Sequence, residues 1–307
     1  MNTNTNTNTN TNTNTNTNTI NYNTPTLSSS AVLVALSIGT WSATKKDKRK
    51  SEELTQDNHA ASNSAEVRKK LLPGSSELEE CKKIERQARL YSMSATMSWN
   101  DDGQRLLPMV SYTDYVATLG NYEKEFWDAV NVFIAAYVQQ RVEAQAKLGD
   151  LFNAEDYPDT ATVRAKFKFS VDYAPVPESG HFVVDLQGQA KDELIEQFNA
   201  RAQSKWSNAF AEVCEEFRDC MTHLLSKVED SGDKQTRMHS SLLPNIRRIL
   251  DKVRTANTFE GNANVEAAAV GLETLLSNVS VDALKSSETA RIQVREGVND
   301  LLSKFDF

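Results

Sequence analysis

Apolar side chains recur at steps of three and four over much of the chain, which is the spacing of one helix face. The longest such run predicts one helix over residues 192–229, because no Gly or Pro interrupts it. A rise of about 1.5 Å per residue makes this helix about 57 Å long. We expect partner helices to cover its apolar face, which consists of Ile195, Phe198, Ala202, Trp206, Ala209, Val213, Phe217, Cys220, Leu224 and Val228.

Shorter runs of the same spacing predict further helices. They cover residues 66–72, 77–91, 122–148, 237–256, 264–278 and 281–305, with turn signals such as Pro73-Gly74 between them. The predicted fold class is therefore mainly α, an elongated antiparallel helical bundle or coiled coil.

The period changes to two at about residues 163–188, between two long helices. Apolar and polar side chains alternate over Phe167–Tyr173 and again over Phe182–Gln187, and the prolines between them exclude a helix. We expect a β-hairpin, which the apolar strand Ala31–Ile38 could extend to three strands. It is either a small sheet capping the bundle or a protein-interaction tip. The tip residues would be Lys166, Lys168, Pro175, Pro177, Glu178, His181 and Phe182.

Composition changes this picture mainly at the N-terminus. The 307 residues begin with nine Asn-Thr pairs, which have no apolar side chain to bury, so we expect a disordered low-complexity tail over residues 1–30. The repeat is an adhesive tail or has no role. Residues 31–307 are expected to form a single elongated helical domain. Three cysteines argue against a disulfide-stapled secreted scaffold, and no apolar run reaches the roughly 20 residues that span a bilayer. We expect a soluble, intracellular protein without a membrane partner.

Charge is unevenly distributed along the chain. The net charge is -8, which argues against a generic nucleic-acid coat, yet a basic cluster follows the first strand. A short basic cluster can bind phosphates, and a nearby tryptophan can stack on a base. Alternatively, the cluster is a solvated loop whose lysines pair with Glu52 and Glu53. The candidate nucleic-acid contacts are Trp41, Lys45, Lys46, Lys48, Arg49 and Lys50.

No pattern in the sequence carries catalytic chemistry. There is no GxxxxGK[ST] phosphate loop, and the four histidines have no metal-ligand spacing to a cysteine. Asp219 and His223 share a helix face and could be half a metal site or a base held by a carboxylate, but a surface pair is the better explanation. Cys214 and Cys220 point to different sides of a helix, so a redox pair is not expected. We predict no catalytic residue, cofactor or metal, and a non-enzymatic protein.

Several segments together resemble a family of phage and prophage proteins catalogued only as a domain of unknown function. They are LSIGTWSATKKDK, RLLPMVSYTDY, LGDLFNAEDYP, PVPESGHFVVDL, FRDCMTHLLSKV and LLPNIRRILDKVRTAN, and the resemblance covers about residues 33–307. One departure is Ala43, where the family pattern has a glycine.

The resemblance implies a setting rather than an activity. Genes of this family tend to lie near genes resembling MoxR-type AAA+ ATPases and von Willebrand A proteins, which implies a protein partner of that kind in the host bacterial cytoplasm. We therefore expect a helical adaptor protein. Two alternatives stay open: a single-stranded nucleic-acid-binding accessory protein, and a structural or assembly component that forms homo-oligomers through its long helices.

Overall fold

The computed structural model describes residues 27–100, 103–177, 189–229 and 238–304. It confirms a mainly helical fold with a small antiparallel sheet. The long helices are α3 (Ser76–Ala95), α4 (Tyr112–Leu148), α6 (Gln189–Val228), α7 (Leu242–Glu260), α8 (Ala263–Leu276) and α10 (Glu288–Lys304). The short ones are α1 (Leu27–Ser30), α2 (Lys48–Asp57), α5 (Thr160–Arg164) and α9 (Val281–Ser286), with 3-10 turns at Met109–Ser111, Gly149–Leu151 and Ala154–Asp156.

A four-stranded antiparallel sheet lies at the centre, in the order β4-β5-β1-β6. Its strands are β1 (Ala31–Gly39), β4 (Met97–Ser98), β5 (Arg105–Pro108) and β6 (Lys168–Pro175). The predicted strand Ala31–Ile38 is confirmed, and it pairs with β6 along its length, from Val32 opposite Pro175 to Gly39 opposite Lys168. The expected hairpin strand near Phe182 lies outside the described residues. The sheet is not confined to the interval 163–188, because three of its strands precede α4.

The two faces of this sheet serve two different hydrophobic cores. Because side chains alternate along a strand, Leu33 and Leu106 point into one core, whereas Val34 and Leu107 point into the other. The first, the α3–α4 core, is rich in aromatic side chains, including Tyr115, Phe126 and Phe133. The second, the α6–α10 core, is mostly aliphatic and joins α6, α7, α8 and α10.

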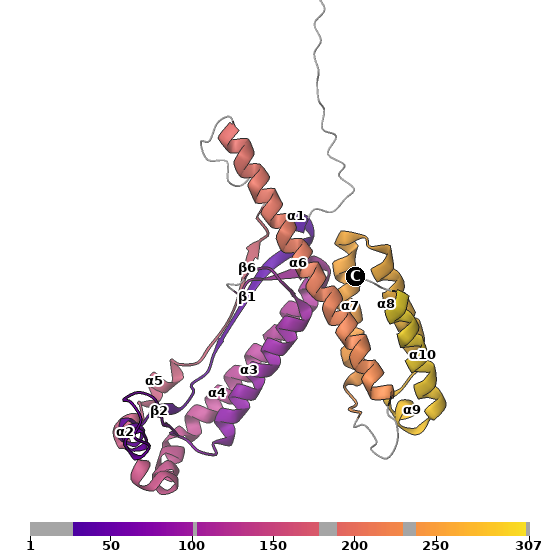
Figure 1. Ribbon diagram of the computed structural model, residues 1–307. Coiled ribbons are helices and arrows are strands. Elements are labelled where there is room, and N and C mark those ends of the chain that lie inside the picture. The colour runs from indigo at the N-terminus through magenta and orange to yellow at the C-terminus, as the bar shows by residue number, and fades with distance from the viewer. Residues whose placement is uncertain (1–26, 101–102, 178–188, 230–237, 305–307) are drawn as a thin grey trace, which may run out of the picture.

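The two cores correspond to two limbs that meet at the sheet (Figure 1). In one limb α3 packs along α4, with β1 and β6 beside them and α2, β2 and α5 at the far end. The other limb holds α6 against α7 and α10, with α8 packed on α7 and α10. The N-terminal part of α6 projects beyond the point where the limbs meet.

Glycines allow α8 and α10 to approach closely at two reciprocal places. A Cβ at Gly271 of α8 would lie 2.6 Å from a methyl of Leu301 on α10. A Cβ at Gly297 of α10 would lie 2.7 Å from both methyls of Leu275 on α8. Each helix therefore offers a notch that receives a leucine of the other.

Several predicted helices differ from the structure in kind or in their bounds, and three of them differ most clearly. Residues 66–72 form a short strand, β3 (Arg68–Lys70), instead of a helix, because three consecutive cations offer no apolar face to bury. The helix predicted from Tyr122 begins at Tyr112, where Tyr115 and Leu119 add two buried positions. The helix predicted over 281–305 is divided at Ser287, whose backbone is extended.

Candidate interaction surfaces

The far end of the α3–α4 limb carries a small basic ribbon. It consists of β2 (Thr44–Lys46) paired antiparallel with β3 (Arg68–Lys70), so that Lys45 lies opposite Lys69 and Lys46 opposite Arg68. Helix α2 follows at once and brings Lys48, Arg49 and Lys50 beside the strands. Eight cationic side chains are thus gathered on two strands and one helical turn.

Like charges placed opposite each other destabilise a strand pair, and here each cation pair shares one carboxylate. Asp156 lies 2.7 Å from the Nζ atoms of both Lys45 and Lys69. Glu66 lies 3.0 Å from Lys46 Nζ and 3.1 Å from Arg68 Nη1. On α2, Arg49 and Lys50 share Glu53.

The Asp156 carboxylate is the buried member of this set. Its side chain is only 5% exposed. Burial acts to raise the pKa of this carboxyl, but hydrogen bonds and charge from Lys45 and Lys69 outweigh burial and hold the pKa below its usual value. Lys69 also donates to the carbonyl of Leu151, at 2.7 Å.

The position of Trp41 argues against base stacking. Trp41 is buried in the α3–α4 core, with its ring centroid 5.7 Å from that of Tyr137 and 6.3 Å from that of Phe133. Its neighbour Ala43 has a φ of 49°, in the left-handed region that favours glycine. A glycine at this position would adopt this backbone without strain.

Sequence reasoning missed three of the eight cations at the basic end. Arg68, Lys69 and Lys70 complete the ribbon, but they follow the Lys45–Lys50 cluster by about twenty residues and were assigned to a helix. The RKK triplet itself was the available signal, because three consecutive cations without an apolar neighbour fit an exposed strand or loop better than an amphipathic helix.

The proposed interaction tip is not gathered at one place. Lys166, Lys168, Pro175 and Pro177 are all exposed. However, Lys168 and Pro175 stand at opposite ends of β6, opposite Gly39 and Val32, about 23 Å apart in an extended strand. Glu178, His181 and Phe182 lie outside the described residues.

The projecting part of α6 offers a different surface. Among the α6 residues whose burial is described, Trp206 is the first along the helix to be buried. Ile195, Phe198 and Ala202 precede it and are only half-buried, although partner helices were predicted to cover them. A pocket of about 410 Å³ lies at the base of the projection, lined by Leu27, Asn199, Ala202, Gln203, Trp206, Phe259 and Glu260.

Two aromatic rings form the wall of this pocket. The Trp206 ring meets that of Phe259 edge-on at a centroid distance of 5.3 Å, and the Trp206 indole N–H donates to a Glu260 carboxylate oxygen at 2.7 Å. An aromatic wall with a fixed polar partner is typical of a pocket that accepts an apolar side chain.

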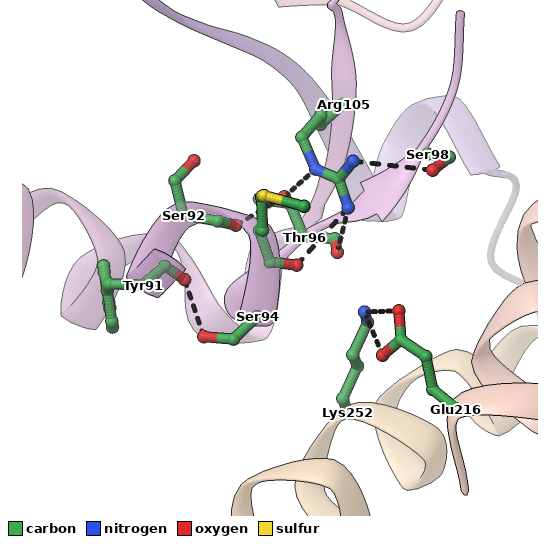
Figure 2. A network of polar contacts seen from close by, with 9 residues as sticks. Tyr91, Ser92, Ser94, Thr96, Ser98, Arg105, Glu216 and Lys252 are labelled. Carbon is green, nitrogen blue, oxygen red and sulfur yellow. Dashed lines mark hydrogen bonds and ion pairs between the residues drawn. The ribbon is translucent and has the colours of Figure 1, made fainter. Parts of the chain in front are cut away.

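Polar contacts stabilise the region where the two limbs meet (Figure 2). Arg105 of β5 donates from Nε to Thr96 Oγ1 at 2.6 Å and from Nη2 to the Thr96 carbonyl at 3.0 Å. It also reaches the Met93 carbonyl and Ser98, so it joins the end of α3 to β4. Across the junction, Lys252 of α7 donates to both carboxylate oxygens of Glu216 on α6, at 2.7 and 2.9 Å.

These two cations are held in a largely dry environment. Burial lowers the pKa of Lys252, while Glu216 acts in the opposite direction. Burial also lowers the pKa of Arg105, again against the charges of Glu216 and Glu212. A groove of about 230 Å³ between α3 and α7 borders Lys252 and contains the carboxylates of Asp114 and Asp251 as well as Arg248. The hydrogen bonds of Arg105 and the Lys252–Glu216 pair each lie within one limb, and the charges of Glu216 and Glu212 act on Arg105 across the junction.

Among the described residues, the structure gives no metal cluster and buries the three thiols. These residues contain no cluster of three His, Cys, Asp or Glu side chains able to hold a metal, and both Asp219 and His223 are exposed. The three thiols are buried, and burial raises the pKa of Cys81, Cys214 and Cys220 to about 11, so they are poor nucleophiles. No helix in the described ranges has the length and apolar character to cross a bilayer.

Comparison with known proteins gives no match among protein-family models, curated proteins or solved structures.

Proposed function

We propose that this protein is a non-enzymatic helical adaptor that binds a protein partner through the projecting part of α6. The pocket beside Trp206 and Phe259 is the observation that carries the proposal, because a concave aromatic site at the base of a projecting helix suits an apolar anchor residue of a partner. The half-buried Ile195 and Ala202 continue the apolar surface along the same helix.

The architecture supports this role. Helix α6 packs against α7 and α10 over its C-terminal part, and we propose that these helices act as an elongated antiparallel bundle, coiled-coil-like, that holds the projection rigid. The resemblance to phage and prophage proteins supports the further proposal that the partner is an AAA+ ATPase or a von Willebrand A protein in a bacterial host.

The test places charge in the pocket without touching the core. Asn199 and Gln203 line the pocket and are exposed, so the double variant Asn199→Arg/Gln203→Arg should remain folded and block an apolar anchor. Gln197, exposed on the opposite side of α6, provides the matched control Gln197→Arg. We would measure binding of the full-length protein to a purified MoxR-type AAA+ ATPase, by biolayer interferometry.

We expect wild type and Gln197→Arg to bind alike and the double variant to lose at least tenfold in affinity. The purified protein alone should hydrolyse no nucleotide. Equal binding by all three variants would refute the pocket as docking site. Absence of binding by the wild-type protein would refute the proposal that the AAA+ ATPase is its partner.

A further inference from the structure

We propose that the basic ribbon, together with the first turn of α2, binds the phosphate backbone of nucleic acid without reading its sequence. This goes beyond the proposed adaptor function, because it concerns the opposite end of the molecule and a different class of partner. The contacts would come from the side chains on the outer face of the ribbon and from α2, namely Lys46, Arg68, Lys70 and Lys48.

The register of the ribbon separates two sets of cations. Since alternate residues face opposite sides, Lys45 and Lys69 share the inner face, where both hold the buried Asp156. Lys46, Arg68 and Lys70 share the other face, and all three are exposed. The inner pair thus anchors the ribbon, while the outer set faces solvent.

On the outer face, cations outnumber the carboxylates that form ion pairs with them. Lys46 and Arg68 share the single carboxylate of Glu66. Within the part of the chain that the structure describes, Lys48 and Lys70 form no ion pair. One ion-paired carboxylate is thus shared by two of the four exposed cations, while Glu52 lies near Lys46 and Lys48 and Glu79 senses the charge of Lys70 without an ion pair. The whole protein has a net charge of -8. Such local excess attracts a polyanion and orients it towards this end.

A small hollow adds a place for one phosphate group. It measures about 190 Å³ and lies between the ribbon and α2. Lys46 and Lys48 border it, with the side chains of Ser62 and Asn63 as further donors and Glu52 on its wall. The residues around this hollow include two lysines and several neutral donors against one carboxylate, which suits the acceptor oxygens of a phosphodiester.

Recognition of bases is not expected. Residues 44–70 contain no Phe, Tyr or Trp, and Trp41 is buried, so the segment that carries the cations offers no aromatic platform for base stacking. The ribbon should bind through phosphates alone, with little difference between sequences and with a strong dependence on salt.

The test uses the full-length protein and a fluorescein-labelled 20-base-pair DNA duplex of mixed sequence, with fluorescence anisotropy between about 50 and 200 mM KCl. Four phosphate contacts predict a slope of log K against log salt of about -3.6 for duplex DNA. The double variant Lys48→Gln/Lys70→Gln should reduce the slope by about 1.8. A second duplex of different sequence should bind equally.

The matched control removes the same charge elsewhere. Lys82 and Lys83 lie on α3 and pair with Glu79 and Glu80, so Lys82→Gln/Lys83→Gln should leave the slope unchanged. Absence of duplex binding at the lowest salt, or equal weakening by both double variants, would overturn the proposal. Binding of a polyglutamate peptide in preference to DNA would also overturn it, and would assign the ribbon to an acidic protein. None of these outcomes bears on the pocket of α6.

Discussion

Replacing Asp156 by Asn tests how the basic ribbon is held to the rest of the protein. The carboxylate is nearly buried and contacts Lys45 and Lys69 at 2.7 Å each. Asn preserves the shape of the side chain but removes the charge, which leaves two opposed lysines on one face of a two-stranded ribbon.

The two lysines contribute unequally to the expected loss. The Lys45 side chain is 52% exposed, so water solvates it and its share is about 0–1 kcal/mol. The Lys69 side chain is 11% exposed; removing one member of a buried pair costs about 3–5 kcal/mol. Because Lys69 keeps the Leu151 carbonyl as an acceptor, we expect a total loss of about 2–3 kcal/mol at neutral pH.

Urea denaturation followed by circular dichroism measures this loss. The exposed Asp150 nearby gives the control Asp150→Asn, which should change stability by less than about 0.5 kcal/mol. Replacing Lys69 by Met in the Asp156→Asn background should recover part of the loss, because no unpaired charge then stays buried.

The pH dependence of stability checks independently that the charged form of Asp156 is the stabilising one. Since the folded pKa of Asp156 is lowered, its stabilising contribution is present above the unfolded pKa of about 3.9 and is lost as pH falls through the folded value. The difference between wild type and Asp156→Asn should therefore be full at pH 7 and shrink below about pH 4. A difference that is the same at both pH values, or none at pH 7, would refute the reasoning.

Three further predictions concern the rest of the molecule. Gly297→Ala should destabilise the protein by about 1 kcal/mol in thermal melts, because the added methyl overpacks against Leu275 by more than the helix propensity of Ala contributes. Gly120→Ala is the control: open space surrounds Gly120, so this change should stabilise by about 0.5–1 kcal/mol. Trp206→Asp should lower the melting temperature by far-UV circular dichroism, because it places a second carboxylate beside Glu260; an unchanged melt would show the indole to be dispensable. Ellman's reagent at pH 8 should find no fast-reacting thiol in the folded protein and three in urea, and a rapid native reaction would contradict the burial of Cys81, Cys214 and Cys220.

The sequence predicted elements best where a long apolar pattern was buried. The strand Ala31–Ile38 is apolar at nearly every position, and the structure explains this because both of its faces meet a hydrophobic core. The helix predicted over 192–229 agrees with α6 within three residues at its start. Its covered face did not follow from the pattern, since Ile195, Phe198 and Ala202 are only half-buried.

The candidate site was less predictable, because its contacts join distant parts of the chain. The pairing of Thr44–Lys46 with Arg68–Lys70 has no apolar alternation to reveal it, and the carboxylate that anchors it, Asp156, lies beyond α4. Trp41 was assigned to the cations by proximity along the chain, but its side chain turns towards Tyr137. Proximity in sequence does not give the direction of a side chain.

The two-faced sheet sets a limit on how the protein can be divided. Leu106 and Leu107 are neighbours on β5 but serve different cores, so no single cut of the chain yields two fragments that each keep an intact interior. A fragment beginning at α6 would lack Leu33 and Leu106 from its hydrophobic interior and expose the surface they cover. Shortened versions made for biochemical work should therefore aggregate unless both segments are supplied together, as complementing pieces.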